Sequence, residues 1–280
     1  MLGWIVAIVL GVVGLFVLAC IPHNVRVMRA RRAYARVPPE LRQEALRLIE
    51  AEAAERRACT FMRLDVDRVP DAQSVAESHV GGAPYAESEV NWPDDARHFL
   101  LQVRLRDPTL GETWQDRLLL VFLRDEYEQV VRSYAAPAAS KHVAIPTPEE
   151  LTFVHLEAIR IPVDDDGYPW TPAMLDEHVP ALHRLLSTFS RDVPGLISQL
   201  LRPGVYGYDL ETPDIAYVGG TPGFVQQPHE AICRICRKPM RFLFQFGEII
   251  PDLQLADGGV CYVYGCDLHP NDCQAFIDTH

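Results

Sequence analysis

The first 36 residues contain no aspartate or glutamate, and residues 2–21 carry no charged side chain of either sign. An uncharged apolar stretch of about 20 residues matches the hydrocarbon thickness of a bilayer at the helical rise. The sequence therefore predicts a transmembrane helix over residues 1–22. No basic residue precedes the stretch, which disfavours a cleaved signal peptide, although Val17–Cys20 is similar to a lipoprotein cleavage site and keeps that alternative open.

Arginine is concentrated directly after the apolar stretch. Because basic residues stay on the cytoplasmic side of a membrane, this predicts a single-pass protein of the inner (cytoplasmic) membrane, with its N-terminus outside and its soluble domain in the cytoplasm. The guanidinium groups would lie at the lipid headgroups, where they either attract anionic lipid or only set the topology. The residues are Arg26, Arg29, Arg31, Arg32 and Arg36.

The rest of the chain is poor in basic residues. The 26 Lys and Arg residues fall to 21 when those five arginines are set aside, against 38 Asp and Glu residues. An acidic surface repels phosphate backbones, so the composition argues against nucleic-acid binding. It favours a protein partner, and a basic one.

A set of landmarks occurs twice, about 140 residues apart, which is typical of a duplicated unit. Each copy has a Val-Gly-Gly-x-Pro segment, a Phe-Leu-x-Gln run, and an aspartate that precedes a second apolar run. These landmarks are Val80–Pro84, Phe99–Gln102 and Asp116 in the first copy, and Val218–Pro222, Phe242–Gln245 and Asp257 in the second.

Apolar spacing predicts the elements around these landmarks. Short apolar runs predict strands at 99–105, 118–123, 241–246 and 260–264. Helical spacing predicts helices after Pro39, from Thr171-Pro172 through Phe189, and near Pro194–Leu201. The predicted fold class is α+β: an internally duplicated antiparallel β-rich unit with flanking helices, preceded by one transmembrane helix. The predicted domains are 1–22, a basic juxtamembrane segment and helix at 23–58, and the duplicated domain at 59–280. Within that domain the first repeat covers about 70–135, a helical insert about 148–204, and the second repeat about 205–275.

Four residues of the second copy have the spacing of metal ligands. They form two pairs, Cys233-x-x-Cys236 and Cys266-x-x-His269. If the two apolar runs between the pairs form an antiparallel hairpin, the chain returns Cys266 to the level of Met240, beside the first pair. Three thiolates and one imidazole form a closed structural zinc site, so the sequence predicts structural zinc here. A redox pair, disulfides and free thiols are the alternatives, whereas Cys261 and Cys273 are expected to be packing or surface residues.

The same landmarks carry a resemblance to a known family. Gly-Gly-x-Pro, Phe-Leu-x-Gln, Asp257-Gly258-Gly259 before an aromatic strand, and Cys233-x-x-Cys-Arg-Lys-Pro-Met240 resemble the bacterial YwqG-like family, a domain of unknown function. The resemblance covers about residues 70–135 and 205–275. It implies an α+β fold with duplicated antiparallel strands and no established activity. It also implies a role as an immunity or partner protein in a toxin system, as suspected for some members. Arg237 departs from the glycine usual in cysteine knuckles.

No arrangement of residues in the sequence indicates a catalytic site. Asp116 and Asp257 are the best acidic candidates, but Asp257 precedes two glycines and is first explained by a turn. Gln102 and Gln245 either face a cleft between the repeats or satisfy backbone groups. The leading hypothesis is therefore a membrane-tethered cytoplasmic binding or scaffold protein, with no catalytic or cofactor-binding residue assigned. The alternative is a hydrolase that uses the cleft between the repeats, with Asp257 or a metal-bound water.

Overall fold

The computed structural model describes residues 25–88, 98–124, 128–144, 151–203, 216–250, 253, 255 and 258–279. Residues 25–36 are helical. The further helices are α2 (Pro39–Ala54), α3 (Pro172–His178), α4 (Pro180–Leu186) and α5 (Val193–Leu201). The strands are β1 (Ala58–Asp65), β2 (His79–Val80), β3 (His98–Arg104), β4 (Leu118–Leu123), β5 (Gln129–Tyr134), β6 (Val154–Pro162), β7 (Tyr217–Val218), β8 (Arg241–Phe246), β9 (Val260–Cys266) and β10 (His269–Asp278).

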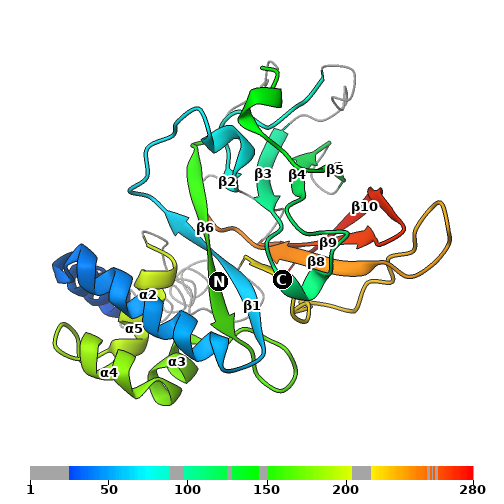
Figure 1. The fold of residues 1–280 in the computed structure, drawn as a ribbon. Coiled ribbons are helices and arrows are strands. Elements are labelled where there is room, and N and C mark those ends of the chain that lie inside the picture. Colours follow the sequence, from blue (N-terminus) through cyan, green and yellow to red (C-terminus); the bar gives the residue numbers. More distant parts are fainter. Residues whose placement is uncertain are drawn as a thin grey trace, which may run out of the picture.

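The strands form one ten-stranded sheet, in the order β10-β9-β8-β7-β1-β6-β2-β3-β4-β5. Every neighbouring pair among the described strands is antiparallel. The strand order is symmetric about the β1–β6 pair: β7 to β10 follow β1 in chain order on one side, and β2 to β5 follow β6 in chain order on the other. The two ends of the sheet also meet, because β5 and β10 contact each other (Figure 1).

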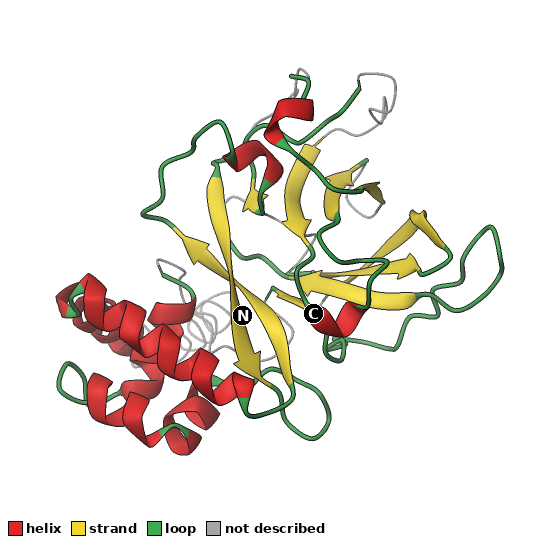
Figure 2. Ribbon diagram, in the orientation of Figure 1, coloured by secondary structure: helices red, strands yellow, loops and turns green. Residues whose placement is uncertain are grey.

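The β1–β6 ladder is the centre of this arrangement. Its register runs without a shift from Ala58 opposite Pro162 to Asp65 opposite His155. Phe61, Ile159 and Ile161 of this ladder belong to one apolar cluster with residues of the helices. Figure 2 shows the α-helices gathered on one side of the molecule, next to β1 and β6, with only short 3-10 turns elsewhere among the described residues. The helices therefore bury one face of the ladder that joins the two halves.

The two Gly-Gly segments follow the short strands β2 and β7. All four of these glycines have positive φ, between 59° and 74°. A Cβ atom on Gly81 would lie 2.5 Å from the Leu151 carbonyl oxygen, and one on Gly219 would lie 2.7 Å from Thr109 Oγ1. Both the backbone conformation and the close approach of neighbouring chain segments therefore require glycine.

A buried carboxylate ties the β3–β4 connection to the central ladder. Asp107 is fully buried and accepts hydrogen bonds from Thr60 Oγ1 on β1 at 2.8 Å and from Arg160 Nη1 on β6 at 2.5 Å. Its other oxygen accepts from the backbone N–H of Thr109 at 2.8 Å. Replacement of the Asp107 carboxylate by a neutral group would weaken all of these buried hydrogen bonds, so it would be destabilising.

The predicted α+β fold class is wrong. The structure is a mostly antiparallel sheet with a few helices. Residues 154–162, which the prediction placed in the helical insert, form the central strand β6. Local patterns did not reveal this strand, because its partner β1 lies far away in the sequence. No helix among the described residues is both long enough and apolar enough to cross a membrane, and the predicted span, residues 1–22, lies outside them.

The helix predicted from Thr171 through Phe189 is two helices. Thr171 caps α3 as expected, since its side chain accepts a hydrogen bond from the Met174 N–H. The helix then ends at His178, and Pro180 begins α4. Proline disfavours the helical conformation of the residue before it, and Val179 has φ −117° and ψ 77°. The helices predicted after Pro39 and near Pro194–Leu201 are confirmed as α2 and α5.

Trp114 makes a second connection between the two halves of the sheet. It lies in the β3–β4 connection and is fully buried. Its ring covers Gly265 of β9 so closely that a Cβ atom there would overlap the ring, and would also lie 2.7 Å from Leu243 Cδ1. Glycine at 265 therefore makes room for a side chain from the other half.

We expect Gly265→Ala to lower the free energy of unfolding by about 3 kcal/mol, because the methyl group overpacks a filled site. Chemical denaturation measures the effect. Gly111→Ala is the matched control: its Cβ would have nothing within 4 Å, so only its positive φ of 79° opposes the change. A loss for Gly265→Ala no larger than the loss for Gly111→Ala would contradict close packing at this site.

Candidate metal centre

The two predicted ligand pairs lie at one end of the β8–β9–β10 region. Cys233 and Cys236 belong to the loop before β8, Cys266 ends β9, and His269 begins β10. Gly265 pairs with Arg241 in the β8–β9 ladder, so Cys266 lies at the level of Met240, as the hairpin argument requires. The loop folds on itself, since the Cys233 N–H donates to the Lys238 carbonyl at 2.9 Å.

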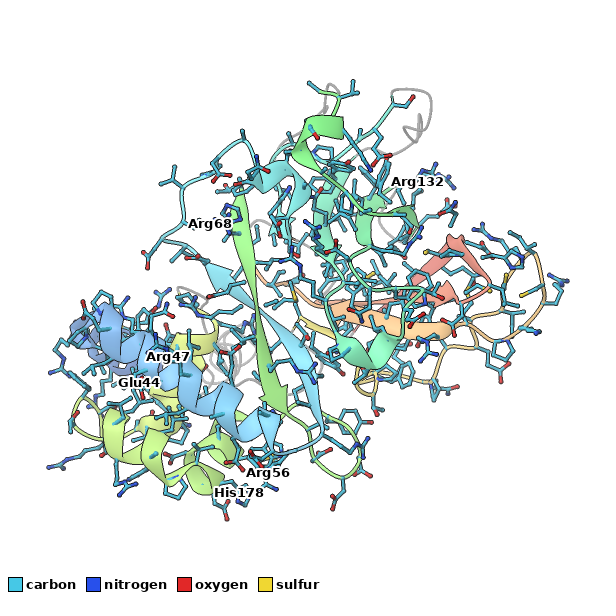
Figure 3. All side chains as sticks on the ribbon, in the orientation of Figure 1. Glu44, Arg47, Arg56, Arg68, Arg132 and His178 are labelled. Carbon is cyan, nitrogen blue, oxygen red and sulfur yellow. The ribbon has the colours of Figure 1, made fainter. Side chains whose placement is uncertain are left out.

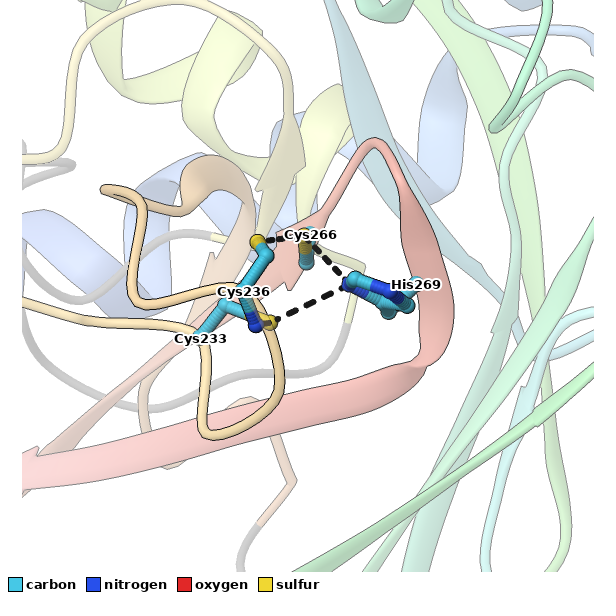
Figure 4. A group of neighbouring side chains, drawn as sticks. All are labelled: Cys233, Cys236, Cys266 and His269. Atoms are coloured by element: carbon cyan, nitrogen blue, oxygen red, sulfur yellow. Dashed lines mark hydrogen bonds between the residues drawn. The ribbon is translucent and has the colours of Figure 1, made fainter.

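The four ligand atoms all lie within 4.8 Å of one another (Figure 4). Cys233 Sγ is 3.5 Å from His269 Nδ1, and Cys266 Sγ is 3.7 Å from the same nitrogen. Cys236 Sγ is 3.6 Å from Cys266 Sγ. Metal bonds of zinc length arranged as a tetrahedron place such donors roughly 3.5–3.8 Å apart. The four residues could therefore hold one metal ion.

The same distances show that the cluster contains no disulfide. A disulfide needs sulfur atoms about 2.05 Å apart. All of the cysteines described by the structure are free thiols, and Cys236 and Cys266 are no exception at 3.6 Å. Cys261 and Cys273 are buried and lie outside the cluster, in agreement with a packing role.

Asp272 binds the cysteine loop through Arg234. Its side chain is only 4% exposed. One oxygen accepts the backbone N–H of Arg234 at 2.7 Å and the other accepts Arg234 Nε at 2.6 Å. Burial by itself would raise the pKa of Asp272, but these hydrogen bonds, with one from the Cys233 thiol, lower it. The charged carboxylate therefore fixes the backbone between the two loop cysteines.

Asp267 fixes the Cys266–His269 turn through contacts outside the cysteine loop. Asp267 accepts Trp114 Nε1 at 2.7 Å and pairs with both Arg241 Nε and Nη2, at 3.1 and 2.9 Å. Trp114 comes from the first half of the sheet. The turn that supplies two of the four ligands is thus attached to both halves.

Arg237 accounts for the unusual knuckle sequence. It has φ 60°, a conformation in which glycine is common and a β-carbon costs about 1 kcal/mol. Its N–H donates to the Cys233 carbonyl at 3.0 Å, which closes the turn. The chain therefore makes the knuckle turn with a strained arginine where glycine was expected.

Those of the predicted acidic and glutamine candidates that the structure describes do not form a second site. Asp116 has φ 61° and makes a two-point ion pair with Arg104, with both contacts at 2.7 Å, and Arg104 holds its pKa below the usual range. Asp257 lies outside the described residues. Gln102 accepts the Tyr85 N–H and Gln245 accepts the Gly223 N–H, at 2.9 and 2.7 Å. Both glutamines are fully buried and satisfy backbone groups rather than line a cleft.

A buried histidine pair was missed from the sequence. His79 of β2 lies opposite His155 of β6 in the ladder. His79 Nδ1 is bonded to the Gly81 carbonyl at 2.8 Å, and His155 Nε2 to Ser74 Oγ at 3.0 Å. Ser74 Oγ in turn donates to Asp71 at 2.8 Å, so serine stands between histidine and aspartate, which is not the order of a catalytic triad. No spacing rule could find the pair, because it is created by strand pairing.

Comparison of the sequence with protein-family models gave no match, and comparison with curated proteins gave none either. The resemblance to the YwqG-like family therefore stays a prediction.

We expect His79 to make the protein sensitive to mild acid. Burial lowers the pKa of His79 from 6.5 to about 4, so the folded protein keeps it neutral while the unfolded chain takes up a proton. The unfolded state then binds more protons between these values, and the free energy of unfolding falls by up to about 3 kcal/mol as the pH drops from 6.5 to 4. Denaturation curves measured across this range test it. His79→Phe should flatten the slope relative to the wild type.

His178→Gln is the control for that experiment, because His178 is exposed on α3. It should keep the slope of the wild type. Any contribution from metal loss is the same in both variants and cancels when their slopes are compared. Equal slopes for His79→Phe and the wild type would contradict the assignment.

Proposed function

We propose that Cys233, Cys236, Cys266 and His269 bind one Zn²⁺ as a structural ion, and that the protein is a binding module rather than an enzyme. The convergence of the four ligand atoms within 4.8 Å carries the proposal. Three thiolates and an imidazole suit zinc, and four protein ligands complete its tetrahedral shell. Such a shell leaves no position for a reacting water, so the geometry gives no support to the alternative of a metal-assisted hydrolase.

The role of the ion would be local. It would attach the irregular loop before β8 to the turn between β9 and β10 and so add to the hydrogen bonds that already hold the loop. The contacts from the loop to β10 include the Asp272–Arg234 pair, the Ile232 carbonyl bonded to Gln274 Nε2 at 2.7 Å, and His229 Nε2 bonded to Asp278 Oδ1 at 2.9 Å. Among the described residues, the first half of the sheet has no comparable cluster at β3 and β4. The sheet itself therefore does not need the metal.

Both metal-binding loops expose an apolar side chain. Ile235, between the two loop cysteines, is 64% exposed, and Leu268, between Cys266 and His269, is 60% exposed. Arg237 and Lys238 beside them are also exposed. One ion would thus hold two apolar side chains and two positive charges in a fixed arrangement. We propose that this knuckle surface binds a protein segment that carries apolar side chains flanked by acidic ones.

This proposal replaces the basic partner expected from composition with an acidic one. The acidic charge of the whole chain favours a basic partner, whereas the knuckle surface is locally basic. A toxin-neutralising role of the kind implied by the family resemblance would be one form of such binding, with the knuckle surface as the contact.

Zinc content provides the first test. We expect about one zinc per purified chain, and its loss in Cys233→Ser/Cys266→Ser, because two of four ligands are removed. Elemental analysis by mass spectrometry measures it. Cys261→Ser removes a buried thiol of the same strand that lies outside the cluster, so it should keep its zinc. Unchanged zinc in the double variant would reject these ligands.

Site-specific crosslinking tests the binding surface. A photoreactive residue at Ile235 should crosslink to an acidic–apolar protein segment, and a chelator should abolish the product because the loop loses its anchor. The same residue at Val69, which is 79% exposed in another part of the chain, is the control. Equal yields from both positions, or no dependence on the chelator, would show that the knuckle surface is not a binding site even if zinc is present.

A further inference from the structure

Four arginines surround a hollow on the helical side of the molecule. Its volume is about 700 Å³ and it is open to solvent. Arg29, Arg32 and Arg36 come from the helical residues 25–36, and Arg191 comes from the connection between α4 and α5. The spacings of three and four place the first three arginines on one face of the helix. Phe189, Ser190 and two alanines complete the lining, which contains no acidic residue.

The hollow is built by contacts between its two segments. Arg36 Nη2 donates to the Phe189 carbonyl at 3.0 Å. Arg42 donates from Nε to the Val37 carbonyl at 2.9 Å and from Nη2 to the Tyr34 carbonyl at 3.2 Å, which satisfies the end of the helix. Ala33 and Val37 are buried in the cluster that packs the helices on the sheet. The helix that presents the arginines is therefore fixed in place.

No acidic group within the described ranges neutralises the positive charge of Arg29, Arg32 and Arg191 in the hollow. Among the residues that the structure describes, no carboxylate pairs with Arg29, Arg32 or Arg191. The adjacent acid, Asp192, is already bound by Arg26 at 2.7 and 3.1 Å and accepts the Gly195 N–H as the cap of α5. Like charges held together without a counterion repel one another. An anion that bridges them would remove this repulsion.

The chain as a whole has a formal charge of −12, so long-range attraction does not bring anions to it. Anion binding here must come from local, directional contacts. The guanidinium fork supplies such contacts to phosphate oxygens, two at a time. The hollow is also larger than a phosphate ion requires and falls in the range of ligand pockets.

We propose that Arg29, Arg32, Arg36 and Arg191 form a binding site for a ligand that carries phosphoryl groups. The ligand is either a soluble phosphorylated compound or the headgroup of an anionic phospholipid, since both present the same oxygens. The site is separate from the metal centre and does not depend on the function proposed for it.

Calorimetry with inorganic pyrophosphate tests the soluble source, with the full chain in nonionic detergent. Arg29→Gln/Arg32→Gln should weaken binding at least about tenfold, because two charge-assisted contacts are lost. Arg191→Gln should also weaken it, from the other segment. Arg47→Gln/Arg68→Gln makes the same change in net charge at two arginines that do not line the hollow, and should leave binding nearly unchanged. Figure 3 labels both arginines.

Retention on vesicles tests the lipid source. Vesicles of phosphatidylcholine are compared with vesicles of phosphatidylcholine mixed with phosphatidylglycerol, using the same variants. A gain on the anionic vesicles that requires Arg29 and Arg32, without pyrophosphate binding, identifies a lipid headgroup. The proposal is overturned if the two double variants lose binding equally in both assays, or if neither ligand responds to Arg29→Gln/Arg32→Gln. Circular dichroism confirms that each variant is folded.

Discussion

The pairing of β1 with β6 is the constraint on which the rest of the structure depends. Eight residues of β1 face eight of β6 without a shift, and each strand then carries one half of the sheet on its outer edge. One face of the pair is covered by the helices, and Asp107 fastens the β3–β4 connection to both strands. A register change by one residue would turn Phe61 and Ile159 away from the helices and separate Asp107 from its partners.

The metal centre and the arginine hollow lie in different parts of this framework. The metal ligands occupy one end of the β8–β9–β10 region, where Trp114 from the other half contacts Asp267 between two ligands. The hollow lies between the N-terminal helical residues and the α4–α5 connection, next to the helices that cover the central ladder. A ligand at either place would stabilise long-range contacts that the sheet itself has already positioned.

Local patterns in the sequence predict part of this structure. The apolar runs mark β3, β4, β8 and β9, and the two spaced pairs mark the metal cluster, because strand pairing between adjacent runs is a short-range event. The role of β6 was missed, since nothing near Val154–Pro162 reveals a partner at Ala58–Asp65. The His79–His155 pair and the Trp114–Gly265 contact were missed for the same reason. The break at Pro180 follows from a local rule, but the apolar stripe across it favoured one helix.

The contact between β5 and β10 bears on how other proteins can bind. The outermost strands of an open sheet offer unpaired backbone groups to any extended chain, which invites strand addition and aggregation. Here each outermost strand has the other as a neighbour, so neither offers a long unshielded margin. Strand addition at either end of the sheet would therefore have to displace this contact, so the way in which the sheet curls disfavours such addition.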